Sequence, residues 1–230
     1  MEEILAEYNK LLSLIDEWFA RCMERYPDKI ACGTGCSSCC RGLFDITLLD
    51  ALFLKRGFDA LSPEVKGRVL AKCGERLGLM REEWPELAHP FLLNHRPDED
   101  WEALMPDEDE TPCVLLDGDG RCLVYDNRPM TCRLHGIPFV DTSGDVMHDE
   151  WCTMNFTETD PLSLPGISAP FDAIFRQEVA LFRQLTSELV GERVQELDTF
   201  IPLALMIDFD NFDWPGWFAD FRPCNNESEE

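Results

Sequence analysis

Thiol side chains gather in two stretches of the sequence. The first stretch, CGTGCSSCC, holds Cys32, Cys36, Cys39 and Cys40. The second is more widely spaced and holds Cys113, Cys122, Cys132 and Cys152. Thiolates are the soft ligands that bind zinc ions and iron–sulfur clusters. The residue types therefore indicate metal binding, and they do not define a reaction.

The spacing predicts that the two stretches meet. A site of four thiolates needs four sulfurs at about 2.3 Å from one point. A short loop can supply two or three of them, so a distant segment must close the shell. We expect residues 32–40 to lie against residues 113–132. Cys39 and Cys40 are adjacent, so we expect their side chains to diverge: either one is not a ligand, or the eight cysteines serve two centres.

Arginines accompany the cysteines in a chain that is otherwise acidic. The four nearest in sequence are Arg41, Arg121, Arg128 and Arg133. Four thiolates on a divalent ion leave a net charge of −2, which nearby guanidinium groups would offset. The alternative is that these arginines pair with acidic side chains on the surface.

The two stretches also carry a family resemblance. CGTGCSSCC and the string GRCLVYDNRPMTCR (120–133) resemble the CxxxCxxCC cysteine-cluster (YkgJ-like) family, a zinc- or iron-chelating domain, over roughly residues 30–155. The resemblance implies metal binding and no agreed reaction; a related cluster occurs in flagellin lysine N-methylases. The candidate ligands that it implies are Cys32, Cys36, Cys39, Cys40, Cys113, Cys122 and Cys132. We add Cys152, which follows the second motif at a suitable distance.

The remaining cysteines and two histidines are weaker candidates. Cys22 and Cys73 lie in predicted helices, where free cysteine is commonly a small buried hydrophobe. Cys224 lies near the acidic C-terminal end, which we expect to be disordered. His135 and His148 could offer an imidazole to zinc or iron, but a surface histidine is the simpler interpretation for both.

Composition limits the classes of partner. The formal net charge of −25 over 230 residues repels phosphate backbones and disfavours anionic membranes, so we expect neither nucleic acid nor membrane as a partner. The N-terminus has no signal-peptide pattern, and we expect a cytoplasmic protein. Thiols stay reduced in that compartment, so clustered cysteines favour metal or redox chemistry over a disulfide framework.

Helices account for most of the elements that must position the cysteines. Apolar periodicity and capping residues predict helices over 2–26, 47–56, 62–79, 171–190 and 193–209. Two apolar runs around Asp-Gly-Asp-Gly predict a β-hairpin over 113–125, and a helical turn should follow at Cys132. Residues 84–112 read as an acidic irregular connector.

These elements predict a mainly α fold with a small β-hairpin, an irregular α+β protein. We expect a single domain over residues 1–230, with helices around a cysteine-rich metal-binding core. Residues 30–155 would form the metal-binding region, and the N-terminal helix 2–26 and the C-terminal helices 170–210 would pack on it.

Three functions remain open at this point. The first is a metal-binding protein with a structural or carrier role, holding zinc or iron, or a 4Fe–4S cluster, in one or two centres. The second is an enzyme with an iron–sulfur or iron centre that modifies a protein or a small molecule. The third is thiol redox sensing through Cys39 and Cys40, although a vicinal pair differs from the thioredoxin arrangement.

Overall fold

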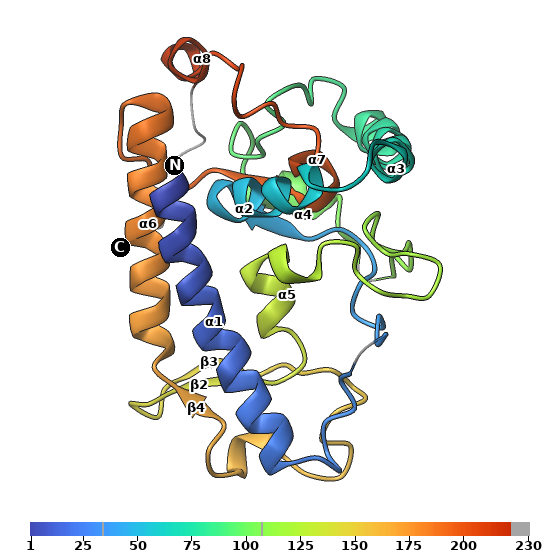
Figure 1. Ribbon diagram of the computed structural model, residues 1–230, viewed down its shortest axis with the longest axis vertical. Coiled ribbons are helices and arrows are strands. Elements are labelled where there is room, and N and C mark those ends of the chain that lie inside the picture. The colour runs from blue at the N-terminus through green and yellow to red at the C-terminus, as the bar shows by residue number, and fades with distance from the viewer. Residues whose placement is uncertain (34, 107, 222–230) are drawn as a thin grey trace.

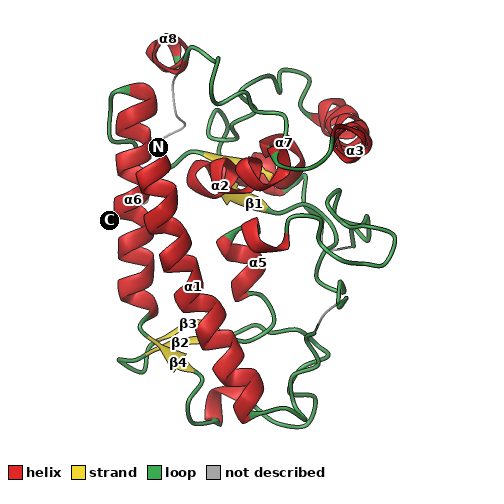
Figure 2. Cartoon of the chain, in the orientation of Figure 1, coloured by secondary structure: helices red, strands yellow, loops and turns green. Residues whose placement is uncertain are grey.

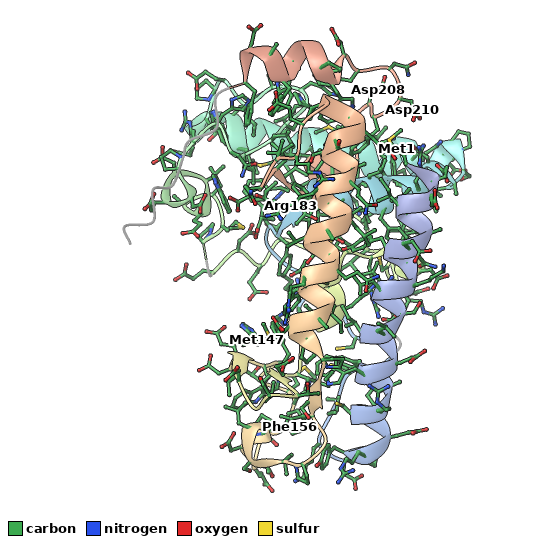
Figure 3. All side chains as sticks on the ribbon, turned by 90° about the vertical axis from the view of Figure 1, so that its left-hand side faces the viewer. Met1, Met147, Phe156, Arg183, Asp208 and Asp210 are labelled. Carbon is green, nitrogen blue, oxygen red and sulfur yellow. The ribbon has the colours of Figure 1, made fainter. Side chains whose placement is uncertain are left out.

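Two long helices run side by side along the molecule in the computed structural model, which describes residues 1–33, 35–106 and 108–221 (Figures 1 and 3). They are α1 (Glu2–Arg25) and α6 (Phe171–Val190). Both were predicted from their apolar periodicity, and α6 ends at Gly191 in the left-handed conformation (φ 81°) that favours glycine. None of the helices within the described ranges is both long and apolar enough to cross a membrane.

A layer of shorter elements covers one end of this pair (Figure 2). Strand β1 (Asp45–Thr47) pairs antiparallel with β5 (Asp198–Phe200), and α2 (Leu48–Asp59) and α7 (Ile201–Ala204) follow these strands. The Thr47 side chain caps α2 through the Asp50 N–H, as its sequence predicts. Helix α3 (Pro63–Glu83) begins after its predicted cap, Ser62.

A small three-stranded sheet lies near the opposite end, in the order β3-β2-β4. Strands β2 (Phe139–Asp141) and β3 (Val146–His148) form an antiparallel hairpin, and β4 (Ser168–Ala169) is parallel to β2. The other short elements are α4 (Asp98–Glu102), η1 (Tyr125–Asn127), α5 (Met130–Leu134), η2 (Pro161–Ser163) and α8 (Trp214–Asp220). The predicted mainly helical α+β fold is confirmed.

Two predicted elements differ in detail. Residues 113–125 do reverse direction, but only a single antiparallel bridge between Leu116 and Cys122 joins the two arms. The hairpin with two paired strands is β2–β3, whose register shifts between Phe139 and Val140. Residues 193–209 are not one helix, because 198–200 pair with β1 and only 201–204 are helical.

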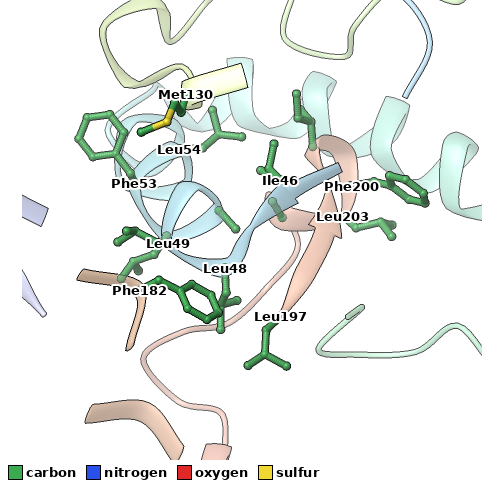
Figure 4. Packing of buried hydrophobic residues seen from close by; sticks show 14 of the residues in the cluster. Ile46, Leu48, Leu49, Phe53, Leu54, Met130, Phe182, Leu197, Phe200 and Leu203 are labelled. Carbon is green, nitrogen blue, oxygen red and sulfur yellow. The ribbon is translucent and has the colours of Figure 1, made fainter. Parts of the chain in front are cut away.

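Aliphatic and aromatic side chains make up most of the core, which also holds Cys22 and Cys73 but none of the candidate metal ligands. Buried residues from α1 through α8 form one hydrophobic cluster, part of which surrounds α2 and the β1–β5 pair (Figure 4). Met130 carries α5 into this cluster beside Phe53 and Leu54. Four of the candidate cysteines are partly buried and pack against its margin: Cys32, Cys113, Cys122 and Cys132. The expected cysteine-rich core is therefore replaced by a cysteine-bearing edge.

Candidate metal centre

The two cysteine stretches meet through their backbones, on the right-hand side of Figure 1. The N–H of Cys113 donates to the carbonyl of Cys40 at 2.9 Å, and Arg41 forms a bridge with Pro112. Further along, a Cβ on Gly120 (φ +75°) would lie 3.2 Å from the Ser37 hydroxyl, so the Asp-Gly-Asp-Gly turn fits closely against the first loop. The chain thus brings residues 35–41 against residues 111–122.

Four thiols gather where these segments meet α5. They are Cys40, Cys113, Cys122 and Cys132, which we call the inner group. The Cys40 thiol is affected by the other three, each of which raises its pKa. Burial raises the pKa of Cys132 strongly, and Cys113 and Cys122 add to this rise. The inner group thus draws one residue from the first loop, two from the bridged turn and one from α5.

The bridged turn offers hydrogen bonds to two of these sulfurs. Burial raises the pKa of Cys113 to about 11, and the backbone N–H of Leu115, which donates to this sulfur, acts in the opposite direction. Burial also raises the pKa of Cys122, where the N–H of Val124 opposes it in the same way. Each donor stands two residues after its cysteine. Donors aimed at sulfur stabilise a thiolate and orient it as a ligand.

Of the other four thiols, three come from the first loop and one from the segment just before Asn155. They are Cys32, Cys36, Cys39 and Cys152, which we call the outer group. Burial raises the pKa of Cys32, the Asn155 amide lowers it, and the nearby Cys152, Cys36 and Cys39 raise it further. Cys36 is exposed, whereas Cys32, Cys39 and Cys152 are partly buried.

Cys39 and Cys40 link the two groups. Contrary to expectation, their side chains do not diverge: the Cys39 thiol donates to the Cys40 sulfur, which raises the pKa of Cys39 and lowers that of Cys40. Their other neighbours differ in part: Cys40 lies among the inner thiols, whereas Cys39 is a neighbour of Cys32 and also acts on Cys132.

Asn155 holds Cys32 in place, a role that no sequence pattern indicated. Its side chain is 1% exposed. The amide nitrogen donates to the Cys32 sulfur at 3.3 Å and to the Gly136 carbonyl at 2.6 Å, and the amide oxygen accepts from the N–H of Ala31 at 2.8 Å. Asn155 also donates its backbone N–H to the carbonyl of Cys152. Two members of the outer group are therefore tied to one residue.

Buried polar side chains fix α5, the helix that carries Cys132. Asp50 is 3% exposed and accepts from both the Tyr8 hydroxyl (2.7 Å) and the N–H of Met130 (2.9 Å). Arg133 is buried, pairs with Asp16 on α1 and donates to the carbonyls of Arg128 and Asp126. Helices α1 and α2 thereby set the position of Cys132.

Three of the four arginines fall into the two expected roles. Arg128 lies 3.9 Å from the centre of the Tyr125 ring, pairs with Asp16 at 3.0 Å, and lowers the pKa of both Cys39 and Cys122. Arg133 and Arg41 bond acidic partners, Asp16 and Glu110. Of the four, Arg128 is the one whose charge is shown to favour thiolates.

A cavity of about 540 Å³ opens beside the outer group. Cys39 and Cys152 line it together with the exposed His135, while Arg41, Trp151 and Met154 form other parts of its wall. Burial lowers the pKa of His135, and so does the nearby His148. The ring of His148 stacks on Phe139.

The thiols of both groups are donors that suit a thiophilic ion. The two groups are defined by which thiols act on one another's pKa, and not by metal–ligand distances. Among the residues that the structure describes, no three His, Cys, Asp or Glu side chains surround a common point as a bound metal would require. The ten described cysteines are free thiols. Eight thiols in two neighbouring sets, with donors aimed at three of the sulfurs, match the chemistry of zinc or iron thiolate sites.

Three cysteines were predicted to lie outside the site. Cys22 and Cys73 are fully buried, with pKa values raised by burial to about 11 and about 12. Cys113 also raises the pKa of Cys73, so α3 passes close to the inner group. Cys224 and the acidic end that we expected to be disordered lie outside the described residues.

Comparison with known proteins agrees with this location. The model of a family named CxxCxxCC, described as "Putative zinc- or iron-chelating domain", matches residues 31–153, more than half of the chain. The match includes all eight candidate cysteines. No match was found among curated proteins or among solved structures.

Proposed function

Because the chain belongs to the CxxCxxCC family of zinc- or iron-chelating domains, we propose that it holds two metal ions in neighbouring four-thiolate centres. The inner group binds one ion and the outer group binds the other. This arrangement uses all eight candidate cysteines and leaves none of them as a spare thiol.

The observation that carries this proposal is the different surroundings of Cys39 and Cys40. Three thiols from the second stretch raise the pKa of Cys40, whereas Cys39 acts on Cys32 together with Cys36 and Cys152 and also adds to the rise at Cys132. Adjacent residues can each serve a different tetrahedral ion. The 4+4 division supports two centres over one.

Charge supports thiolate ligands at this edge of the molecule. Two four-thiolate centres with divalent ions would place a net charge of about −4 close together in an acidic protein. Arg128 offsets part of this charge at Cys39 and Cys122, and hydrogen bonds from Leu115, Val124 and Asn155 spread more of it over backbone and amide donors.

Metal analysis tests the proposal directly. The protein is purified without oxygen, and zinc, iron and acid-labile sulfide are quantified per chain. We expect two ions per chain without sulfide. Iron with stoichiometric sulfide would replace the single ions by clusters, one ion per chain would contradict the two centres, and metal-free protein with freely titratable thiols would contradict metal binding.

Single substitutions assign the ions to their groups. Cys36→Ser should remove the outer ion and Cys132→Ser the inner ion, each leaving about one ion per chain and lowering the melting temperature, because metal-binding energy at such sites is folding energy. Cys73→Ser is the matched control, a buried cysteine close to Cys113, and it should retain both ions. Loss of both ions in either single variant would show that the division into groups is wrong.

A further inference from the structure

The two cysteine groups differ in how far they are open to solvent. The cavity of about 540 Å³ is lined by Cys39 and Cys152 of the outer group, and its lining among the described residues includes no cysteine of the inner group. Cys36 of the outer group is exposed, whereas all four inner cysteines are partly buried. A small molecule could therefore reach the outer group without any rearrangement of the core.

Three cysteines of the inner group, Cys113, Cys122 and Cys132, pack against the margin of the hydrophobic core. Val114, Leu115 and Val124, which flank its turn cysteines, are each at most 5% exposed, and Met130 anchors α5 in the same cluster. The Cys113 N–H bonds the Cys40 carbonyl, and buried Asp50 and Arg133 fix both ends of the α5 segment. Releasing an ion from this group would require part of the core to open, which costs far more than loop motion.

The outer group rests on surface segments. Gly33 and Gly35 lie in the first loop, and both are exposed. On the other side, Thr153 and Met154 follow Cys152 and are exposed. This segment is held by the bonds of Asn155, by the N–H of buried Phe156, which donates to the Lys29 carbonyl, and by the Ser38 hydroxyl, which donates to the Met154 sulfur. Figure 3 shows Phe156 at the end of the molecule remote from α8.

On these grounds we propose that the outer group is an exchangeable metal site, from which a small acceptor with soft donor atoms takes the ion through the cavity, while the inner group keeps its ion as a structural centre. This inference rests on the proposed function. Each metal–sulfur bond that breaks is replaced by a bond from the ion to the acceptor. The released thiolate takes up a proton from water, and no electron is transferred. His135, on the cavity wall, offers an imidazole nitrogen to the ion during transfer.

Chelator kinetics on the full-length zinc-loaded protein test this proposal. Zinc per chain is counted first: a value of one contradicts the two centres, which separates failure of the proposed function from failure of this inference. An excess of the coloured chelator 4-(2-pyridylazo)resorcinol is then added. We expect one equivalent to leave at least about ten times faster than the other, with the melting temperature largely retained after the fast phase. Release of both equivalents at one rate would overturn the inference.

A pair of matched variants tests the role of the cavity. Met154 lines the cavity and is 49% exposed, whereas Met147 on β3 is 42% exposed and lies outside the lining (Figure 3). Met154→Trp should slow the fast phase about tenfold at unchanged zinc content, and Met147→Trp should leave it unchanged. Equal effects of the two substitutions would contradict entry through the cavity.

Cysteine variants identify which of the two groups releases its equivalent of zinc in the fast phase. Cys152→Ser should lose the fast equivalent and keep the slow one. Retention of the fast phase in Cys152→Ser would assign rapid exchange to the inner group and overturn the proposal. Neither outcome depends on a variant of the core, so a failure to fold does not obscure the result.

Discussion

Asn155 joins three parts of the chain through one side-chain amide. It bonds the Cys32 sulfur, the Gly136 carbonyl and the Ala31 N–H, and it is almost completely buried. An amide donor on sulfur fixes the direction in which a thiolate presents its lone pairs. The residue therefore belongs to the outer group even though it is no ligand in the proposal.

Asn155→Ala should weaken the outer centre selectively. It leaves the Gly136 carbonyl and the Ala31 N–H without partners, so the free energy of unfolding should fall by about 1–3 kcal/mol. Zinc affinity of the outer group should fall about 10–100-fold, with the inner ion retained. Urea denaturation and zinc competition measure the two effects.

The control for this residue is Asn9→Ala on the exposed face of α1. It should change neither zinc affinity nor stability by more than about 0.5 kcal/mol. If Asn155→Ala lowered the affinity of both centres equally, Asn155 would be a general stabilising residue and not one that positions Cys32.

At the scale of elements, the close contact between α2 and η1 determines where the chain enters α5, the helix that carries Cys132 of the inner group. A Cβ on Gly57 would lie 2.5 Å from side-chain atoms of Asn127, whose amide donates to the Phe53 carbonyl at 3.2 Å. Residues 125–127 lead directly into α5 and Cys132. Glycine at position 57 therefore allows the chain to approach α2 closely just before this ligand.

Gly57→Ala should be destabilising although alanine is the better helix former. The gain in helix propensity is about 1 kcal/mol, but the clash must displace Asn127 and, with it, the start of α5, at a cost of about 1–3 kcal/mol. We expect a lower melting temperature and faster loss of the inner zinc in the chelator assay.

Gly74→Ala in α3 is the matched control for this substitution. A Cβ there meets nothing within 4 Å, so the variant should be more stable than the wild type by up to about 1 kcal/mol. A stabilising Gly57→Ala would show that η1 does not rest on α2 as described.

Buried acids collect where α1, α2 and α6 meet. Asp50 is buried beside Tyr8, and burial raises its pKa to about 6. Burial raises the pKa of Glu178 on α6 to about 8, and Asp50 and Asp198 raise it further. A carboxyl with a raised pKa in the folded state stabilises the fold below its unfolded pKa, and this contribution is lost as pH rises through the folded value.

For Glu178 the affected window runs from about pH 4.5 to about pH 8. Glu178→Gln replaces the carboxyl by an amide that stays neutral. The free energy of unfolding of the variant relative to the wild type should therefore rise by about 1–3 kcal/mol between pH 5 and pH 9. Urea denaturation at both pH values measures this rise, and titration of the cysteines cancels in the difference between variant and wild type.

Glu17→Gln, at an exposed position of α1, is the control and should show no such rise. A difference independent of pH for Glu178→Gln would contradict a raised pKa of this carboxyl in the folded state.

At the scale of the molecule, local signals in the sequence predicted the helices and failed where pairing is non-local. Thr47, Ser62 and Gly191 mark helix ends through bonds and conformations within a few residues. Residues 198–200 form a strand only because 45–47 lie beside them, a partner about 150 residues away that no local pattern reveals.

The candidate site was likewise predictable only where local patterns were enough. The spacing of the cysteines predicted that the two stretches meet, because metal ligands must converge. The division between Cys39 and Cys40 depends on which thiols from 113–152 lie nearby, and the role of Asn155 depends on contact with Cys32 across 123 positions. Such pairings arise from the packing of the whole chain.

The net charge of −25 should make the stability of the whole molecule depend on salt. Mutual repulsion among exposed acids opposes the compact state. The screening length falls from about 30 Å at 0.01 M salt to about 10 Å at 0.1 M, which weakens this repulsion. Many of the ion pairs in the described residues are solvent-exposed, such as Lys10–Glu7 and Arg68–Glu64, and such pairs contribute little.

We therefore expect the melting temperature of the metal-loaded protein to rise by about 2–4 °C or more for each kcal/mol of repulsion that is screened, as sodium chloride increases over this range. Calorimetry measures the shift. Tetramethylammonium chloride at equal ionic strength is the control and should act alike, because screening depends on ionic strength and not on the cation. A melting temperature that falls with salt would mean that attractive pairs, such as Arg128–Asp16 and Arg76–Asp109, outweigh the repulsion among the acids.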